Sequence, residues 1–340
     1  MNLPVPLDLP PMEARLVAGI PSGDDWQFEP KWDGFRCLAF RDGDELALRS
    51  KSGQPFERYF PEIVARLQAL DARRFVLDGE LVVGVDGALS FDDLLQRIHP
   101  AESRVRLLAR ERPATFWVFD LLVDAAGKAL LDAPLAERRT ALEDFARRSI
   151  PPDDARLRLS PATRARSEVD AWYARVGGAL DGIVAKRLDA PYRAGARDAA
   201  LKVKAIRSAD CVVGGYRASD DGAAVASLLL GLYDERGRLD YVGFTSGFAA
   251  AEKRALLERF RPLLAEASFT GRAPGGPSRW NRGKSTQWQP VRPELVLEVA
   301  FDQVTAQRFR HGTRPLRWRL DKAPRSCTLD QLASSAAVLP

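Results

Sequence analysis

A lysine directly ahead of an Asp-Gly pair is the first residue in the sequence whose type and setting suit covalent chemistry. Lys31 lies in the run Glu-Pro-Lys-Trp-Asp-Gly-Phe-Arg that spans residues 29–36. A protonated lysine has no free lone pair, and it becomes a nucleophile when nearby charge or burial lowers its pKa. Lysines and Asp-Gly pairs are also common in ordinary surface turns, so this segment gains meaning only beside other charged clusters.

Two carboxylates, Asp78 and Glu80, occur within one apolar run. Residues 75–83 read as a strand, and the alternation of side chains along a strand places both carboxylates on the same face. Burying them is unfavourable unless positive charge or hydrogen-bond donors lie against them. A metal ion, a ribose hydroxyl or a structural partner such as an arginine would each serve, and the sequence leaves all three open.

Lys202 and Lys204 make the same pattern with the opposite charge, on a predicted strand at residues 201–204. Two ammonium groups so close repel each other, and an anion between them would relieve that repulsion. The alternative is a solvated edge strand whose lysines prevent aggregation. Asp181 and Lys186 bracket a further apolar strand, so a carboxylate, a turn glycine and a lysine again occur together.

An aromatic residue and a basic cluster complete the candidate groups. Phe119 lies in the apolar run 115–123, where it suits either stacking on a purine base or packing in the core. Near the C-terminus, basic residues surround Asp321; they are Arg314, Arg317, Arg319 and Lys322. Because arginine binds phosphate in a bidentate manner, this cluster is either a phosphate clamp or a solvated basic tail.

The periodicity of apolar residues predicts the elements that position these groups. Strands are expected at residues 26–29, 35–40, 45–49, 75–83, 115–123, 182–186, 201–204, 210–216, 227–233 and 294–301. Helices are expected at residues 61–70, 91–98, 135–148 and 250–265, with another ending near residue 176. A chain of 340 residues favours two domains, and we expect the boundary near residues 205–209. Short strands with one inserted helix after this boundary fit a five-stranded OB-type barrel.

Composition limits the class of protein. The net charge of +5 favours an anionic partner such as nucleic acid. Three widely spaced cysteines indicate a reducing compartment, and only two histidines argue against histidine metal sites and Ser-His-Asp triads. The N-terminal residues lack the pattern of a signal peptide, and no apolar run reaches membrane-spanning length. We therefore expect a cytoplasmic protein with no membrane partner.

Taken in order along the chain, these clusters resemble those of the covalent nucleotidyl transferases. The matching motifs are Lys31-x-Asp33-Gly34-x-Arg36, Ser50-Lys51-x-Gly53, Asp78-Gly79-Glu80, Phe119-Asp120, Asp181-Gly182-x-Val184-x-Lys186, Lys202-x-Lys204 and Arg319-x-Asp321-Lys322. This superfamily comprises ATP-dependent DNA ligases, RNA ligases and mRNA capping enzymes. The resemblance covers roughly residues 26–325 and is nearest to the small stand-alone bacterial ATP-dependent DNA ligases, often called ligase C.

The resemblance implies an α+β fold in two parts. Residues 1–205 would form the adenylation domain, a nucleotidyl-transferase domain of ATP-grasp-like antiparallel sheets with helices. Residues 206–340 would form a C-terminal OB-fold β-barrel. The implied activity is ATP-dependent sealing of 5′-phosphate/3′-hydroxyl nicks in duplex DNA, in DNA repair and recombination.

The resemblance also implies a role for each matched residue. Lys31 would attack the α-phosphate of ATP and carry AMP. The implied nucleotide contacts are Glu29 and Phe119 on adenine, Arg36 and Lys51 on ribose and phosphate, Glu80 on ribose or metal, and Lys186, Lys202, Lys204 and Arg319 on phosphate. Asp181, with Glu80, would help to hold a divalent ion, Mg²⁺ or Mn²⁺. Asp321 and Lys322 would act with Arg319 in a mobile second domain.

Three positions depart from the usual ligase pattern. Lys51 stands where most ligases have arginine, which keeps the charge and loses the bidentate fork. Asp181 replaces the usual glutamate and shortens the reach to a metal by one methylene, and Leu201 replaces a tryptophan.

The implied partner is nicked double-stranded DNA, gripped by a monomer that closes as a clamp, with other DNA-repair proteins as possible recruiters. Candidate DNA contacts are the loop at residues 272–284, the C-terminal arginines, and residues 51–58. Three alternatives stay open at this point: an RNA ligase, a capping guanylyltransferase, and a non-catalytic DNA-end-binding scaffold.

Overall fold

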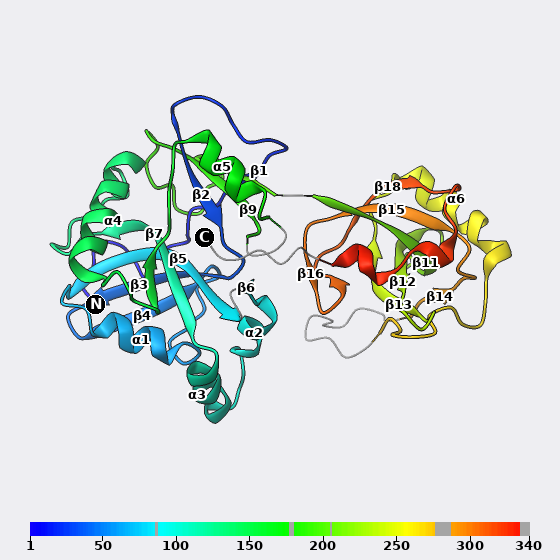
Figure 1. Cartoon of the computed structure of the whole chain (residues 1–340), viewed down its shortest axis with the longest axis horizontal. Helices are drawn as coiled ribbons and strands as arrows, with labels where there is room; N and C mark the ends of the chain where they lie inside the picture. Colours follow the sequence, from blue (N-terminus) through cyan, green and yellow to red (C-terminus); the bar gives the residue numbers. More distant parts are fainter. Residues whose placement is uncertain (86–87, 177–179, 205, 276–286, 334–340) are drawn as a thin grey trace. The chain divides into compact units, whose positions relative to one another are not determined.

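The computed structural model describes residues 1–85, 88–176, 180–204, 206–275 and 287–333. The chain divides into two compact units, residues 1–205 and residues 206–334, and each unit is described by itself below (Figure 1). Among the described residues, no helix is long and apolar enough to cross a membrane.

The larger sheet of the first unit is mostly antiparallel and has the strand order β4-β3-β5-β7-β8, with β6 paired to β5. Its strands are β3 (Phe35–Asp42), β4 (Glu45–Ser50), β5 (Arg74–Val85), β6 (Ala88–Leu89), β7 (Ala114–Val123) and β8 (Leu157–Leu159). The β3–β4 hairpin turns at Gly43, whose φ of 63° is open to glycine and disfavoured for other residues. On β5, Asp78 pairs with Leu38 and Glu80 with Arg36, so both carboxylates share a face with Arg36.

The smaller sheet of this unit has the order β1-β10-β9-β2. Its strands are β1 (Arg15–Leu16), β2 (Trp26–Lys31), β9 (Gly182–Arg187) and β10 (Ala200–Val203). Lys31 ends β2 opposite Gly182, the first residue of β9. Gly182 has a φ of 151°, and a Cβ there would lie 2.1 Å from the carbonyl oxygen of Val203. Only glycine permits this approach of β9 to β10, which brings the start of β9 beside the Lys-x-Lys segment.

Helices surround the two sheets. In the first unit they are α1 (Pro61–Gln68), α2 (Phe91–Gln96), α3 (Glu102–Glu111), α4 (Leu135–Ser149) and α5 (Arg166–Tyr173). Pro61 occupies the first turn of α1, as its fixed φ favours. Arg41 donates to carbonyl oxygens at the other end of this helix, Leu67 at 2.6 Å and Leu70 at 2.8 Å. Pro61 therefore stabilises the start of α1, and Arg41 satisfies free carbonyl oxygens at and just after its C-terminal end.

Helix α4 is joined to β7 by a buried ion pair. Arg138 Nε donates to Asp120 Oδ1 at 2.8 Å, and both side chains are almost fully buried. Asp120 follows Phe119 on β7, so this pair fixes the strand that carries the aromatic candidate. A buried pair of this kind is poorly tolerant of losing one partner.

The main sheet in the described part of the second unit has the order β13-β12-β11-β15-β18, with β14 paired to β11. Its strands are β11 (Arg207–Ala218), β12 (Val225–Tyr233), β13 (Leu239–Thr245), β14 (Gln289–Pro290), β15 (Val296–Phe301) and β18 (Arg314–Trp318), and a separate hairpin joins β16 (Val304–Thr305) to β17 (Arg308–Phe309). Helix α6 (Ala250–Phe260) continues as a 3-10 turn, η1 (Arg261–Leu263), and two further turns are η2 (Pro324–Ser326) and η3 (Leu329–Leu332). Strands β11, β12 and β15 supply most of an apolar core on which Leu256 and Phe260 of α6 pack.

Most of the elements predicted from periodicity are confirmed. Several strands were not expected, β8 and β13 among them, and further differences concern one helix and two other segments. Helix α3 was not expected, since its few apolar residues leave most of its surface charged. The predicted helix at residues 250–265 ends as an α-helix at Phe260. Residues 314–318, expected as a basic tail, form β18 against β15 because alternate side chains pack or pair across that strand. The described residues of the second unit form an open sheet and no closed barrel.

Candidate active site

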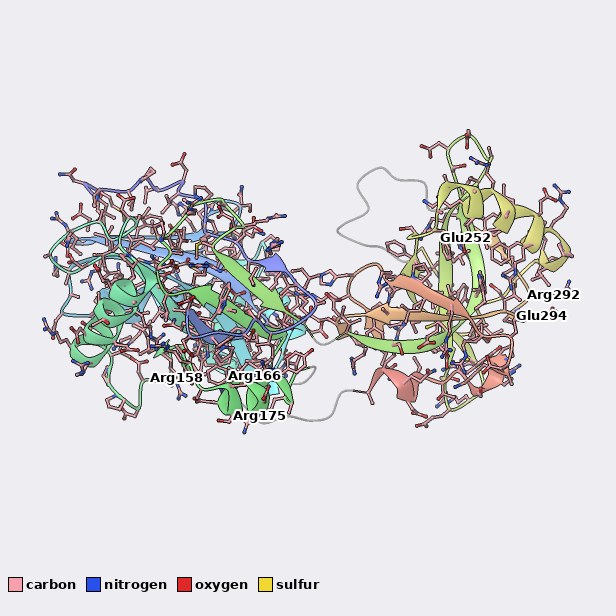
Figure 2. All side chains as sticks on the ribbon, turned by 90° about the horizontal axis from the view of Figure 1, so that it is seen from above. Arg158, Arg166, Arg175, Glu252, Arg292 and Glu294 are labelled. Carbon is pink, nitrogen blue, oxygen red and sulfur yellow. The ribbon has the colours of Figure 1, made fainter. Side chains whose placement is uncertain are left out.

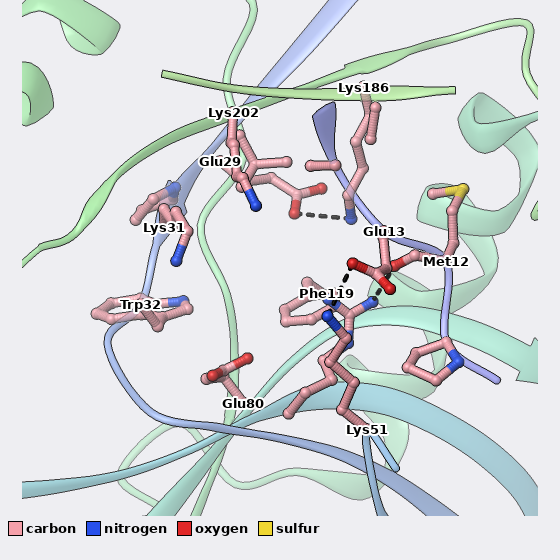
Figure 3. A pocket seen from close by; sticks show the side chains of 16 residues that line it. Met12, Glu13, Glu29, Lys31, Trp32, Lys51, Glu80, Phe119, Lys186 and Lys202 are labelled. Carbon is pink, nitrogen blue, oxygen red and sulfur yellow. Dashed lines mark hydrogen bonds and ion pairs between the residues drawn. The ribbon is translucent and has the colours of Figure 1, made fainter. Parts of the chain in front are cut away.

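A pocket lies between the two sheets of the first unit. Its lining residues are Pro11, Met12, Glu13, Ala14, Glu29, Pro30, Lys31, Trp32, Arg36, Lys51, Glu80, Phe119, Val184, Lys186, Ala200 and Lys202. Lys31, Lys186 and Lys202 point into it from β2, β9 and β10, and Glu80 and Lys51 from the opposite sheet (Figure 3). The pocket is thus lined by four lysines and three glutamates, which are Lys31, Lys51, Lys186, Lys202, Glu13, Glu29 and Glu80.

Lys31 forms an ion pair with Asp181, the residue directly before β9. The Nζ of Lys31 contacts Asp181 Oδ2, and the Nζ of Lys204 lies 3.3 Å from the same oxygen. Asp181 also donates its backbone N–H to the carbonyl oxygen of Lys31 at 2.8 Å. The Lys31 side chain keeps 24% of its surface exposed, whereas Asp181 keeps 5%. The nucleophile candidate is therefore held by a buried carboxylate while its amine remains open to the pocket.

Glu29 and Lys186 form a second ion pair on the same sheet. Lys186 Nζ lies 2.8 Å from Glu29 Oε2, and Gln27 Nε2 donates to Glu29 Oε1 at 2.8 Å. Both members of the pair are buried. Lys186 Nζ also lies 4.6 Å from the centre of the Phe119 ring, which is a cation–π distance.

On the larger sheet, Arg36 of β3 is oriented by Asp78 of the neighbouring strand β5. Arg36 Nε and Nη2 donate to the two carboxylate oxygens of Asp78 at 2.5 and 2.6 Å. Tyr192 donates its hydroxyl to Asp78 Oδ2 at 2.6 Å. The guanidinium lies 4.5 Å from the centre of the Phe119 ring. The structural partner that the sequence left open for Asp78 is therefore an arginine, and a tyrosine joins it.

Glu80 and Lys202 have shifted pKa values. Burial raises the pKa of the Glu80 carboxyl to about 7, although Arg36 and Lys31 oppose the shift. Burial lowers the pKa of Lys202, and the neighbouring ammonium groups of Lys31 and Lys204 lower it further. The repulsion that the sequence predicted for the Lys-x-Lys pair is thus part of the pocket's electrostatics.

Trp32 fixes the backbone next to Lys31. Its ring stacks on Trp117 with centroids 4.4 Å apart, and its Nε1 donates to Ser160 Oγ at 2.9 Å. Gly34 completes this turn, since a Cβ there would lie 2.2 Å from the carbonyl oxygen of Leu81. The glycine of the Asp-Gly pair is therefore required by close packing against β5.

Residues 11–14 form a wall of the pocket that sequence reasoning missed. Glu13 Oε2 lies 2.7 Å from Lys51 Nζ and 3.0 Å from a guanidinium nitrogen of Arg197. The carbonyl oxygen of Met12 accepts from Arg36 at 3.2 Å, and its N–H donates to Tyr192 at 2.9 Å. No pattern in this proline-rich lead-in marks it as part of a site, because its contacts are all distant in sequence.

The donor set suits a divalent ion only in partnership with a phosphate ligand. The described residues contain no group of three or more His, Cys, Asp or Glu side chains placed to hold a metal. Mg²⁺ typically uses one or two protein carboxylates together with substrate phosphates and water. Glu80 and Asp181 provide carboxylates of this kind at the pocket, and a metal bound by them would depend on the nucleotide.

The remaining candidate, Arg319, belongs to the second unit. It follows β18 and contacts Asp321 and Asp210, with Arg319 Nη1 lying 2.8 Å from Asp210 Oδ1. Its neighbour Lys322 lies 3.0 Å from Asp210 Oδ2. The sequence cluster thus becomes a compact ion-pair group within its own unit rather than a solvated tail.

The assembled pocket is suited to group transfer at phosphorus. An amine stands at its edge, several cations are placed to balance phosphate charge, and an aromatic ring and a buried glutamate line the rest. Preorganised positive charge of this kind stabilises the charge that develops during phosphoryl-type transfer.

Comparison with known proteins agrees with this chemistry. A family model described as "ATP dependent DNA ligase domain" matches residues 11–204, and one described as "ATP dependent DNA ligase C terminal region" matches residues 221–322. The chain is 44% identical to DNA ligase C of Mycobacterium tuberculosis, over 98% of this chain and 96% of the relative. It is 43% identical to DNA ligase C1 of Mycolicibacterium smegmatis, again over 98% of this chain and 96% of the relative.

A solved structure shows the same fold at lower identity. A structure from a study of Lig E DNA ligases superimposes with a TM-score of 0.56 at 17% identity, covering 90% of this chain and 99% of that chain. The two matching family models together with relatives of this identity and coverage establish the assignment. The chain belongs to the ATP-dependent DNA ligase family.

Proposed function

We propose that this ATP-dependent DNA ligase seals 5′-phosphate/3′-hydroxyl nicks in duplex DNA through an AMP carried on Lys31. The observation that carries the proposal is the pocket itself. Lys31 opens onto a cavity shared with Lys51, Lys186 and Lys202, and its amine is held by Asp181. This is the arrangement that attack of an amine on a nucleotide α-phosphate requires.

In the first step, the amine of Lys31 forms a bond to the α-phosphorus of ATP while the bond to pyrophosphate breaks. The ammonium must lose a proton beforehand, and Asp181 is the carboxylate in contact with it. Lys186, Lys202 and Lys204 would balance the phosphate charge as it redistributes.

The remaining pocket residues would hold the nucleoside. Glu29 and Phe119 would contact adenine, with the Phe119 ring already flanked by Arg36 and Lys186. Arg36 and Lys51 would bind ribose and phosphate. Glu80 would accept hydrogen bonds from ribose hydroxyls, which its ionised form does best.

Glu80 and Asp181 would contribute carboxylates to a divalent ion, Mg²⁺ or Mn²⁺, held jointly with the nucleotide phosphates. When bound, such an ion supplies positive charge to the phosphates and the leaving pyrophosphate. The Asp181 side chain is one methylene shorter than the glutamate usual at this position. We therefore expect Asp181 to bind the ion while its carboxylate stays close to the Lys31 amine.

The second unit would act as a mobile OB-type domain. Its sheet with one helix between β13 and β14 is compatible with an OB-type arrangement. Arg319, with Asp321 and Lys322, would orient the pyrophosphate during the first step. We propose that residues 1–205 are the adenylation domain and that the protein acts as a monomer.

In the later steps, AMP passes from Lys31 to the 5′-phosphate at the nick, and the 3′-hydroxyl then attacks and expels AMP. Contacts with the duplex would be to phosphates, without reading of sequence, so binding should weaken steeply with salt. Exposed arginines on and beside β8 and α5, namely Arg158, Arg166 and Arg175, add to the candidates for these contacts (Figure 2). Of the predicted DNA loop at 272–284, residues 276–284 lie outside the described residues.

The biological setting follows from the reaction. An enzyme that seals nicks without reading sequence serves DNA repair and recombination, and we propose recruitment by other repair proteins on the bacterial nucleoid. The net charge of +5 supports association with DNA.

A pulse and chase tests the proposal. The protein is incubated with α-labelled ATP and a divalent metal, isolated, and then mixed with nicked duplex DNA. We expect label on the protein that is lost as nicks are sealed, and no labelling of Lys31→Ala. Arg187→Ala, which changes an exposed ion pair outside the pocket, is the matched control.

Other outcomes identify the alternatives. Label that stays on the protein when nicked DNA is added, but leaves the protein when RNA is added, would assign RNA ligation. Label from GTP and not ATP would assign a capping-type guanylyltransferase. Absence of label from either nucleotide would refute the enzyme and leave a DNA-end-binding scaffold.

A further inference from the structure

In the second unit, the buried carboxylate of Asp210 forms ion pairs with Arg319 and with Lys322, the two cations of the Arg-x-Asp-Lys motif. Asp210 lies on β11, and only 7% of the residue is exposed. Arg319 Nη1 lies 2.8 and 3.0 Å from its two carboxylate oxygens, and Lys322 Nζ lies 3.0 Å from Oδ2. One aspartate, distant by more than 100 residues in sequence, therefore organises both cations.

The two edges of the Arg319 guanidinium have different partners. Its Nη1 faces Asp210, whereas Nε and Nη2 donate to the two oxygens of Asp321 at 3.0 and 2.9 Å. The Asp321 side chain is 70% exposed and that of Asp210 is 10% exposed. The Asp321 carboxylate can be replaced on this edge by another anion, because an ion pair with an exposed carboxylate contributes little free energy.

The backbone around Asp210 is fixed independently of these ion pairs. Gln331 accepts from the N–H of Asp210 at 2.9 Å and donates to its carbonyl oxygen at 3.1 Å. At the other side, the N–H of Arg319 donates to the carbonyl oxygen of Val296 at 2.8 Å. The carboxylate therefore stands on a strand, while Arg319 and Lys322 lie in a turn after β18 and reach Asp210 through their side chains.

The local charge is balanced. The carboxylates of Asp210, Asp321 and Glu298 lie among the cations of Arg317, Arg319 and Lys322, and Glu298 lies 2.6 Å from Arg317. If a phosphate replaced Asp321 on the Nε and Nη2 edge, Arg319 would keep Asp210 on its other edge. The guanidinium would then present a planar bidentate surface in a fixed orientation.

We propose that Asp210 is a positioning residue for nucleotide transfer: it holds Arg319 and Lys322 in the shape that receives the pyrophosphate of ATP, with Asp321 as the exchangeable partner. The inference rests on the function proposed above for Arg319. It adds that a residue outside the C-terminal motif sets the geometry of that motif.

The test separates the first step from the last. In Asp210→Asn, formation of labelled lysyl-AMP from ATP is measured in single turnover, and joining of a nick that already carries 5′-AMP is measured with the same preparation. We expect the first rate to fall on the order of 100-fold, as for a misplaced catalytic contact. Joining of the pre-adenylated nick should stay within about twofold, because no pyrophosphate takes part in it.

Two further variants sharpen this test. Asp210→Glu keeps the charge and should recover much of the first-step rate. Asp234→Asn removes a carboxylate that lies 2.8 Å from Arg238 in a hairpin of the same unit, and both rates should match the unmodified protein. In the reverse reaction, added pyrophosphate attacks the lysyl-AMP, the bond from Lys31 to phosphorus breaks and labelled ATP forms. This reaction should be slowed in Asp210→Asn to the same extent as the forward step.

The contrary results are distinct. An equal fall of both steps in Asp210→Asn would show a purely structural role and overturn the proposal, as would an unchanged first step. If the unmodified protein itself forms no lysyl-AMP, the proposed function fails, which is a separate result from a failure of Asp210 alone.

Discussion

The two cation clusters of this protein are built from the same residue types and balanced in different ways. In the first unit, Lys31, Lys186 and Lys202 line a pocket, and Lys31 and Lys186 are paired with the carboxylates of Asp181 and Glu29. In the second unit, Arg319 and Lys322 are closed around the buried carboxylate of Asp210. A cluster with open space at its centre is ready for a ligand, whereas a cluster centred on a carboxylate must exchange a partner first.

The difference lies in where the neutralising charge comes from. Asp181 and Glu29 lie on or beside the same sheet as the lysines they pair with, so a ligand can enter without displacing them. Asp321 covers an edge of Arg319 from within the same turn. The cations of the first unit therefore face a pocket, whereas Arg319 and Lys322 of the second unit are already paired with carboxylates.

The largest expected effect comes from breaking the pair that holds Lys31. Asp181→Asn removes the negative charge shared by Lys31 and Lys204 and leaves their ammonium groups to repel each other. We expect lysyl-AMP formation from labelled ATP to fall by about 100-fold or more, the range found when one preorganised charge is removed from a site.

Asp181→Glu is the control for charge. It restores the residue usual in the family at this position, and we expect most of the rate to be retained. Equal losses in Asp181→Asn and Asp181→Glu would mean that keeping the charge is not sufficient and that the position of the carboxylate matters as well.

The next effect is on stability and concerns the opposite wall of the pocket. Asp78 is fully buried and receives both Arg36 and Tyr192. Asp78→Asn leaves the guanidinium without its charge partner, and we expect the free energy of unfolding to fall by about 3 kcal/mol. Urea unfolding followed by tryptophan fluorescence measures it.

The exposed pair of Arg187 and Asp189 supplies the comparison. Both side chains are about half exposed, so Asp189→Asn should change the free energy of unfolding by less than about 0.5 kcal/mol. If the two variants behaved alike, burial of Asp78 would not be what makes its contacts important.

Much of the fold and of the pocket was predictable because local patterns carried the information. The alternation of apolar residues predicted β5 and the shared face of Asp78 and Glu80, and the turn glycine Gly182 marked the start of β9. Motif order then placed Lys31, Glu29, Arg36, Lys51, Glu80, Phe119, Lys186 and Lys202 in one site, and all of these line the pocket.

The parts that could not be predicted are the pairings between distant segments. Nothing local in the sequence indicates that Glu13 meets Lys51, that Tyr192 meets Asp78, or that Asp210 meets Arg319. Such contacts depend on how the sheets bring separate stretches of chain together, and many partners of the right charge compete for each residue.

The clusters also differ in the direction in which their acids respond to pH. Burial raises the pKa of Glu80 to about 7. In the second unit, the hydrogen bond between Arg319 and Asp321 lowers the pKa of Asp321 to about 2. Between pH 4.5 and 7 the folded protein therefore binds more protons at Glu80 than the unfolded chain does. The free energy of unfolding should fall as pH rises through this interval, by at most about 1.4 kcal/mol per pH unit.

Glu80→Gln tests this sign. In metal-free buffer the variant should lose the component of the pH dependence that lies between pH 4.5 and 7, as measured by urea unfolding at each pH. The contribution of Asp321 should be present above pH 3.8 and be lost only as pH falls toward 2. A variant with the same slope as the unmodified protein would assign the titration to another group.

The smallest expected effect concerns Glu13, a pocket residue whose ion pair with Lys51 resembles the ion pair of Asp321 with Arg319 in the second unit. Like Asp321, it covers a cation that the nucleotide is expected to need, here Lys51. The Lys51 side chain is 56% exposed, so the ion pair is a weak competitor for a phosphate or ribose oxygen.

Glu13→Gln should therefore tighten ATP binding by about threefold, the scale of an exposed ion pair. Calorimetric titration in a Lys31→Ala background avoids turnover, and Glu143→Gln, which alters an ion pair with Arg139 away from the pocket, serves as the matched control. The difference should shrink at high salt, because screening weakens the competing pair. Weaker binding by Glu13→Gln would instead make Glu13 a ligand group for the nucleotide, and the parallel with Asp321 would then be wrong.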